Sequence, residues 1–104
     1  MLIRTTSKIH TMNTNNHSWV EISTRALIHN ITSYKKLLEP TTLLAPVIKS
    51  EAYGHGMIQV ASILETCPAV DYLCTVSLSE SLKLRAAGIQ KPLLVLSIID
   101  EDLT

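Results

Sequence analysis

Short apolar runs alternate with segments of helical periodicity along most of this 104-residue chain. "WVEIS", residues 19–23, alternates apolar and polar positions as a half-buried strand does. Ser23 or Thr24 can then cap a helix that Pro40 ends. The helix carries one apolar stripe at spacings of four, three and four: Leu27, Ile31, Tyr34 and Leu38. Because strands that alternate with helices over short connections pair in parallel, this pattern predicts an α/β fold.

The rest of the chain repeats the alternation. Apolar runs predict strands at residues 43–48, 72–76 and 93–99, and helical spacing predicts helices at 57–67 and 77–87. Ser77 and Glu80 have the spacing of a capping box. Gly88 suits the position directly after the helix at 77–87, because glycine enters the left-handed conformation without steric cost. Runs that are apolar throughout suit buried strands, although Pro46 is unfavourable inside one.

Both a doubly wound sheet and a partial (β/α)8 TIM-type barrel, first few βα units only, fit this order. No G-x-G-x-x-G follows any strand, which disfavours a dinucleotide-binding sheet. A complete barrel needs roughly 250 residues. This chain has less than half of that length, and the residues leave both folds open at this point. Residues 1–17 are predicted to be a disordered polar leader, since they lack the apolar core of a secretory signal.

Composition excludes several classes of function. Nine basic and nine acidic residues give a net charge of zero, so neither nucleic acid nor an anionic membrane is an expected partner. Apolar runs of about six residues fall short of the roughly 18 that span a bilayer. Cys67 and Cys74 form no C-x-x-C pair, and they fit a reducing cytoplasm better than a disulfide scaffold. His55 has no second ligand at metal-binding spacing, so no metal is expected.

The segment "VIKSEAYGHG" combines a lysine, a tyrosine and two glycines at one predicted strand end. Lys49 is either a solvated lysine or a nucleophile that forms a Schiff base with a carbonyl. Gly54 and Gly56 form either a tight turn or a backbone that approaches an anion at the next helix. Sites in α/β folds lie at the carboxyl ends of the strands. The combination suggests a ligand with a carbonyl and a phosphate, and pyridoxal phosphate has both.

"VIKSEAYGHG" resembles the pyridoxal-phosphate lysine motif of bacterial alanine racemases. The resemblance runs from "WVEIS" through "TRALIHNITSYKKLL" to "VSLSESLKLRAAGIQKPLLVLS", in the order found at the amino end of that family. Ser50 and Glu51 stand where the family pattern has Ala-Asn or similar small and polar residues. That departure leaves the lysine assignment intact, and no role is expected for Glu51.

The resemblance implies racemisation of L-alanine and D-alanine, with D-alanine supplied for peptidoglycan. Lys49 would hold pyridoxal 5'-phosphate as a Schiff base and exchange protons with the substrate Cα. Tyr53 would contact the cofactor phosphate, and Val47 and Leu96 would line the cofactor pocket. Full-length family members are homodimers with a shared active site. Their second base is a tyrosine from the carboxyl-terminal domain of the partner subunit, and Tyr53 is not that residue.

The resemblance implies that residues 18–104 are the amino-terminal portion of a barrel domain, which provides only the first part of such a site. An open parallel sheet exposes backbone groups and apolar faces, so we expect the polypeptide alone to be inactive, and poorly folded or aggregation-prone. Three alternatives stay open: a non-catalytic pyridoxal-phosphate-binding barrel protein, a remnant of a decayed gene, and a fragment that pairs with a separate carboxyl-terminal half. The residues do not distinguish alanine from serine as the substrate.

Overall fold

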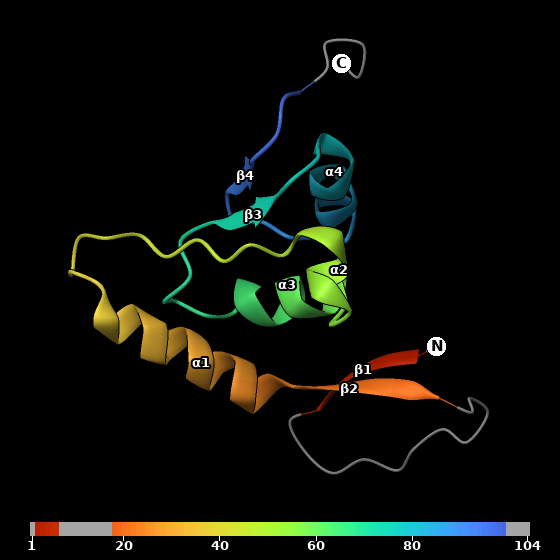
Figure 1. Cartoon of the computed structure of the whole chain (residues 1–104), viewed down its shortest axis with the longest axis horizontal. Helices are drawn as coiled ribbons and strands as arrows, with labels where there is room; N and C mark the ends of the chain where they lie inside the picture. The colour runs from red at the N-terminus through yellow and green to blue at the C-terminus, as the bar shows by residue number, and fades with distance from the viewer. Residues whose placement is uncertain (1, 7–17, 100–104) are drawn as a thin grey trace.

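The computed structural model describes residues 2–6 and 18–99 (Figure 1). The elements in chain order are β1 (Leu2–Thr6), β2 (Trp19–Ser23), α1 (Thr24–Leu37), α2 (Lys49–Tyr53), α3 (Met57–Glu65), β3 (Leu73–Thr75), α4 (Leu78–Ala86) and β4 (Leu93–Val95). Both strand pairs, β1 with β2 and β3 with β4, are parallel. The prediction of a mixed α/β fold with parallel strands is confirmed. None of the helices in these ranges is long and apolar enough to cross a membrane.

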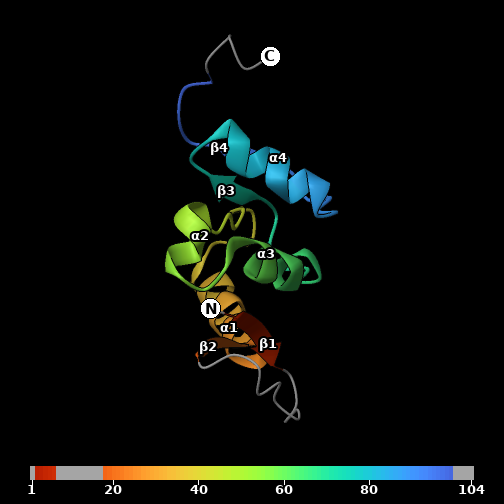
Figure 2. The ribbon, with the colours of Figure 1, turned by 90° about the vertical axis from the view of Figure 1, so that its right-hand side faces the viewer.

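Part of the predicted leader lies in a strand. Leu2–Thr6 pairs with β2 in a register that sets Leu2 opposite Trp19, where the sequence suggested a disordered segment. Ile3 is half-buried, and its side chain lies beside Gly56 at the start of α3. Residues 1 and 7–17 lie outside the described ranges, so the disorder predicted for them stays a prediction. Figures 1 and 2 place the β1–β2 pair at one end of the molecule and β3–β4 toward the other.

Helix α1 begins and ends where the sequence predicts. The Oγ of Ser23 accepts a hydrogen bond from the N–H of Ala26 at 3.1 Å, which caps the first turn. The helix ends at Leu37, ahead of Pro40, which disfavours helical backbone in the residue before it. Ile31 is buried in the core, whereas Tyr34 is 64% exposed. The predicted apolar stripe is therefore buried only over the first half of the helix.

The segment at residues 43–48 pairs with β3 without forming a regular strand. Cys74 donates its N–H to the Pro46 carbonyl at 2.8 Å, and Ile48 donates to the Cys74 carbonyl at 2.9 Å. In a regular parallel ladder, residue 46 would also donate its N–H to the carbonyl of Tyr72. Pro46 has no N–H, so this hydrogen bond is missing. The prediction of a continuous strand is wrong here, but the parallel direction and the place beside β3 agree with it.

The helices predicted from apolar spacing at 57–67 and 77–87 are confirmed as α3 and α4, and the predicted capping box of α4 is confirmed too. In α4 the Ser77 hydroxyl accepts the Glu80 N–H, and the Glu80 carboxylate accepts the Ser77 N–H, as the capping box predicts. Gly88 follows the helix with φ of +94°, as predicted. The core joins these helices to the segments around them; its buried members are Ile31, Ile48, Met57, Val60, Ala61, Leu64, Cys67, Val70, Leu73, Leu84 and Ile89.

The small sheet around β3 has one covered face and one bare face. Val47 forms a bridge to Cys74, which in turn pairs with Leu94, so these positions share a face, and Leu96 follows two residues later. On that face Val47, Leu94 and Leu96 are 52%, 49% and 53% exposed, and only the small Cys74 side chain between Val47 and Leu94 is buried, at 4%. The prediction that 93–99 is a buried strand is wrong, because nothing in the described ranges covers this side. Side chains of the other face are almost fully buried: Ile48, Leu73 and Thr75.

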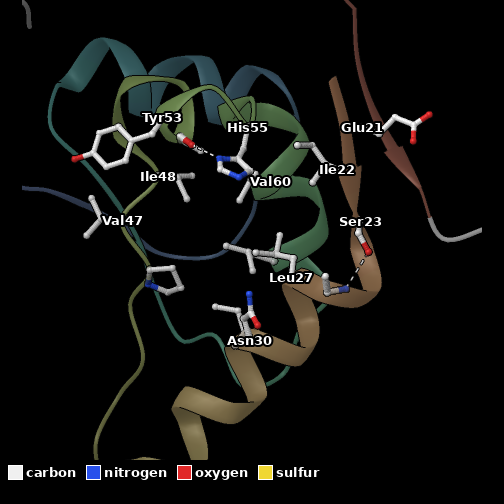
Figure 3. A pocket seen from close by; sticks show the side chains of 15 residues that line it. Glu21, Ile22, Ser23, Leu27, Asn30, Val47, Ile48, Tyr53, His55 and Val60 are labelled. Atoms are coloured by element: carbon white, nitrogen blue, oxygen red, sulfur yellow. Dashed lines mark hydrogen bonds between the residues drawn. The ribbon is translucent and has the colours of Figure 1, made fainter. Parts of the chain in front are cut away.

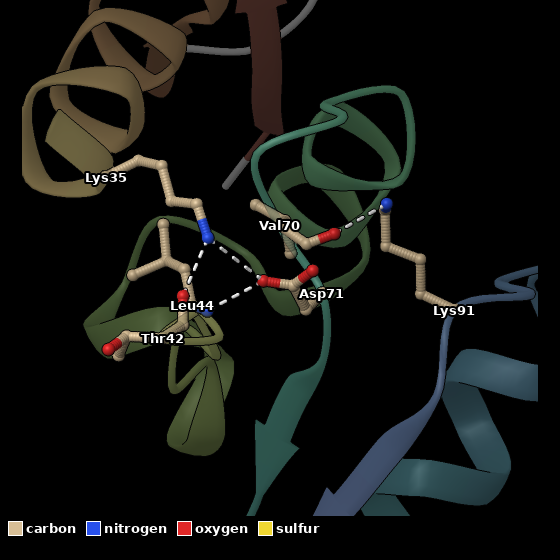
Figure 4. Close-up of polar contacts among 6 residues, drawn as sticks. All are labelled: Lys35, Thr42, Leu44, Val70, Asp71 and Lys91. Atoms are coloured by element: carbon tan, nitrogen blue, oxygen red, sulfur yellow. Dashed lines mark hydrogen bonds and ion pairs between the residues drawn. The ribbon is translucent and has the colours of Figure 1, made fainter. Parts of the chain in front are cut away.

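Polar contacts fix the amino end of this sheet (Figure 4). The Asp71 carboxylate accepts the N–H of Leu44 at 2.8 Å and lies 3.5 Å from the ammonium of Lys35. Lys35 also donates to the carbonyl of Thr42 at 2.8 Å. Asp71 therefore ties the start of the 43–48 segment to the loop before β3 and to α1.

This contact predicts a pH-dependent local stability. The bond from Leu44 N–H and the positive charge of Lys35 hold the pKa of Asp71 below its ordinary value near 3.8, although partial burial opposes them. A carboxyl group with a lowered pKa stabilises the fold above its unfolded-state pKa, and this contribution is lost as pH falls through the folded-state value. We expect hydrogen-exchange protection of the Leu44 amide to be high at pH 6 and to fall below about pH 4.

Asp71→Asn provides the control for this expectation. The variant keeps one acceptor oxygen but loses the charge, so protection of Leu44 should be weaker than in the wild type at pH 6 and nearly independent of pH. If both proteins lose protection in parallel as the pH falls, another group controls the contact.

Candidate functional site

Lys49 lies at the carboxyl edge of the small sheet. It follows Ile48, which donates to the Cys74 carbonyl in β3, and Leu96 donates its N–H to the Thr75 carbonyl at 2.8 Å on the other side. Lys49 and Leu96 therefore flank the carboxyl end of β3, the edge where α/β folds hold their sites. Lys49 is half-buried, and no carboxylate in the described part of the chain forms an ion pair with it.

The turn after Lys49 has a left-handed backbone. The φ angles of Ser50, Glu51, Ala52 and Tyr53 are 52°, 55°, 52° and 54°, so α2 is a left-handed turn and not an ordinary helix. Such a conformation costs about 1–2 kcal/mol for each L-residue. Backbone strain of this kind persists only where surrounding contacts hold it, and it is concentrated at functional sites. A bond from the Ala52 N–H to the Ile48 carbonyl, 3.2 Å long, closes the turn.

The two glycines serve the turn rather than an anion. Gly56 has φ of +87° and ψ of 111°, a region that other residues rarely enter, and a Cβ there would lie 2.4 Å from the Gln59 side chain. The N–H of Met57, at the start of α3, donates to the Glu51 carboxylate at 3.1 Å. The Glu51 carboxylate thus occupies the amino end of α3, which is where the sequence allowed an anion to bind.

Glu51 is therefore a cap for α3, although the sequence suggested no role for it. Its backbone carbonyl also accepts the N–H groups of Gly54 and Gly56, at 3.2 and 2.8 Å. No sequence signal points to this function, because Glu51 stands six residues before Met57, outside the spacing of a capping box.

Lys49 and Tyr53 lie side by side on this turn. The Lys49 ammonium is 6.0 Å from the centre of the Tyr53 ring, the outer limit of a cation–π contact. The phenol is 77% exposed. Val47 and Leu96 lie on the bare face of the sheet, near the carboxyl ends of the 43–48 segment and of β4, which flank β3. The structure brings Lys49 and Tyr53 together and places the two apolar residues on the adjoining face.

A cavity of about 370 Å³ adjoins the turn, between α1 and β2 on one side and α2 and α3 on the other (Figure 3). Tyr53, His55 and Asn30 are among its lining residues, whereas Lys49 is not. His55 donates from Nδ1 to the Ala52 carbonyl at 2.8 Å, which makes it a residue of the turn. The predicted Schiff-base chemistry needs the Lys49 amine, which does not line the cavity. The candidate site is therefore the strand edge that carries Lys49, beside the cavity.

Glu80 is a further residue of the site, and the sequence indicated only one of its two roles. One carboxylate oxygen accepts the N–H groups of Val76 and Ser77, at 3.0 and 3.1 Å. The other accepts the N–H of Ser50 at 2.8 Å. Although burial opposes it, these N–H donors hold the pKa of Glu80 below its ordinary value. The capping box indicated the first oxygen, but no local pattern indicates a partner 30 residues away.

The two cysteines are poor candidates for chemistry at this edge. Cys67 and Cys74 are buried and not bonded to each other, and burial raises the pKa of the Cys74 thiol. Within residues 2–6 and 18–99, no three histidine, cysteine or acidic side chains are grouped as metal ligands.

Comparison with known proteins decides the family. A family model described as "Alanine racemase, N-terminal domain" matches residues 22–103, and this range includes the Lys49 turn, β3 and β4. The chain belongs to the alanine racemase family. The relationship implied by "VIKSEAYGHG" is confirmed.

Three alanine racemases illustrate the similarity. The enzyme of Syntrophobacter fumaroxidans is 49% identical over 80 residues, 77% of this chain and 21% of that protein. Alanine racemase 2 of Oceanobacillus iheyensis is 42% identical over 85 residues, 82% of this chain and 21% of that protein. The crystal structure of the Bacillus anthracis enzyme with bound L-Ala-P is 37% identical with a TM-score of 0.65, over 72% of this chain and 19% of that one. This chain spans about a fifth of the length of these alanine racemases.

Proposed function

We propose that this chain is the amino-terminal part of an enzyme that interconverts L-alanine and D-alanine with pyridoxal 5'-phosphate. The single observation that carries the proposal is the position of Lys49. It lies at the carboxyl edge of a parallel sheet, on a strained turn, in a chain of the alanine racemase family. The bound L-Ala-P of the Bacillus anthracis relative supports an alanine-like ligand.

The residues of the turn fit this cofactor. Pyridoxal phosphate has an aldehyde, which an amine attacks, and a phosphate, which accepts hydrogen bonds. The Lys49 amine forms no ion pair within the described ranges, so it is available to the aldehyde. The Tyr53 hydroxyl stands exposed on the same turn and would donate to the phosphate. When bound, the cofactor ring withdraws electrons from the substrate Cα and makes its proton more acidic.

Lys49 would then hold or release a proton on one face of the substrate Cα. A racemase needs a base on each face, because the proton leaves one side and returns on the other. Tyr53 is on the same turn as Lys49, so it is unsuited to the opposite face. By family resemblance, that base belongs to a partner subunit of a homodimer.

We further propose that the small sheet is the beginning of a (β/α)8 barrel. Helices cover one face, and the opposite face carries Val47, Leu94 and Leu96 in register, all apolar and about half exposed. Layers of such side chains fill the interior of a barrel. Val47 and Leu96, at its carboxyl end, would line the cofactor pocket.

A chimera tests the proposed function. Residues 19–99 of this chain would replace the matched amino-terminal segment of the Oceanobacillus iheyensis alanine racemase 2, with the rest of that protein unchanged. We expect the chimera to convert L-alanine to D-alanine, measured by chiral chromatography. Its kcat/KM should be within about a hundredfold of the relative's, since misplacement by about 1 Å costs that factor. A folded chimera that takes up the cofactor without racemising alanine would contradict the proposal.

A further inference from the structure

Glu80 connects the turn that carries Lys49 to the neighbouring strand. Its two carboxylate oxygens have different partners. Oε1 accepts the N–H groups of Val76 and Ser77, and the bond from Ser77 belongs to the capping box. Oε2 accepts the N–H of Ser50 at 2.8 Å, and the cap does not need this bond.

The bond from Ser50 is placed where it controls the direction of Lys49. Ser50 is the first of the four left-handed residues, so its N–H belongs to the peptide that joins Lys49 to the strained turn. Once that peptide is anchored, the left-handed backbone that begins at Ser50, directly after Lys49, cannot relax toward right-handed geometry without breaking a hydrogen bond to a charged acceptor. The Lys49 side chain itself has no ion pair in the described ranges to hold it.

We propose that Glu80 is a positioning residue that holds the Lys49 amine in place for the cofactor aldehyde. The inference rests on the proposed function of Lys49. It assigns the two oxygens of one carboxylate separate tasks, since Oε1 caps α4 and Oε2 anchors the Lys49 turn to the end of β3. Glu80 itself touches neither substrate nor cofactor in this assignment.

Three variants separate these tasks. Glu80→Gln keeps one oxygen, which can still cap α4, but its amide nitrogen cannot accept the Ser50 N–H. Ser77→Ala removes the hydroxyl half of the cap and leaves the Ser50 bond in place. Glu65→Gln is a matched control, because Glu65 also accepts two backbone N–H groups, from Gln90 and Lys91 at 2.8 and 3.1 Å, on the approach to β4.

The test uses the chimera described above with pyridoxal phosphate as the probe. After borohydride reduction, peptide mapping measures the share of label on Lys49 relative to Lys36, an exposed lysine of α1. Hydrogen exchange measures protection of the Ser50 amide. We expect Glu80→Gln to lower that protection about tenfold, the loss of one bond to a charged group. The Lys49 share should fall severalfold with it, while Ser77→Ala and Glu65→Gln leave the share unchanged.

Two results would overturn the assignment of Glu80. One is an unchanged Lys49 share in Glu80→Gln, and the other is an equal fall in all three variants, which would mean a general loss of folding. Failure of the proposed function is distinguishable from both. In that case the folded parent chimera would already label Lys49 no more than Lys36, and the positioning role would fall with it.

Discussion

Lys49→Ala should abolish both racemisation and covalent attachment of pyridoxal phosphate in the chimera. The substitution removes the amine that we propose as the cofactor attachment point and as one of the two bases. Loss of a base alone lowers rates by about 10²–10⁴-fold, so kcat/KM should fall by at least about 10³-fold when the attachment is lost as well. Borohydride reduction followed by peptide mapping should find label on Lys49 in the parent chimera and none at that position in the variant.

The loss should not come from unfolding. Lys49 is half-buried and forms no ion pair within the described ranges, so the circular dichroism spectrum of the variant should match that of the parent. Lys36→Ala is the matched control, since Lys36 is exposed on α1, and it should leave activity and labelling unchanged. Full activity of Lys49→Ala would exclude this lysine from the chemistry.

The 104-residue polypeptide prepared alone should not racemise alanine at a rate above the uncatalysed background. Tyr53 is 77% exposed, and Val47 and Leu96 are about half exposed, so water has free access to the Lys49 edge. Exclusion of water is what strengthens electrostatic interactions in a closed site. The turn also offers a base on only one face of the substrate. Chiral chromatography of L-alanine incubated with the chain and pyridoxal phosphate measures the outcome.

We also expect the isolated polypeptide to associate as its concentration rises. Leu94 and Leu96 on the bare face and Ile98, 94% exposed, form an apolar surface beside the edge of β4. Light scattering should detect this, and the chimera, in which the rest of the relative covers the same face, should scatter less. Racemisation by a monomeric fraction of the isolated chain would contradict the prediction that it is inactive.

The sequence predicted the features that depend on neighbouring residues. Ser23 and the stripe through Ile31 locate α1, because a cap and a 3.6-residue period are local properties. The Ser77–Glu80 box and Gly88 bound α4 for the same reason. The position of Lys49 at a carboxyl strand edge follows from its place after an apolar run, and the family follows from the motif around it.

Features that depend on distant partners appeared only in three dimensions. Pro46 interrupts a strand because it lacks the N–H that the carbonyl of Tyr72, just before β3, would accept. One face of the predicted strand at 93–99 is bare because nothing in the described ranges covers it. Glu51 stands at the start of α3 only because the turn between them is left-handed.

The sequence alone thus determined the order of the elements, the helix caps and the lysine. Tertiary structure decided how that lysine is held: a left-handed turn, anchored at Ser50 by Glu80. The physical reason is that an L-residue disfavours positive φ on its own. Such a turn persists through contacts with residues far along the chain, and these leave no period or spacing in the sequence.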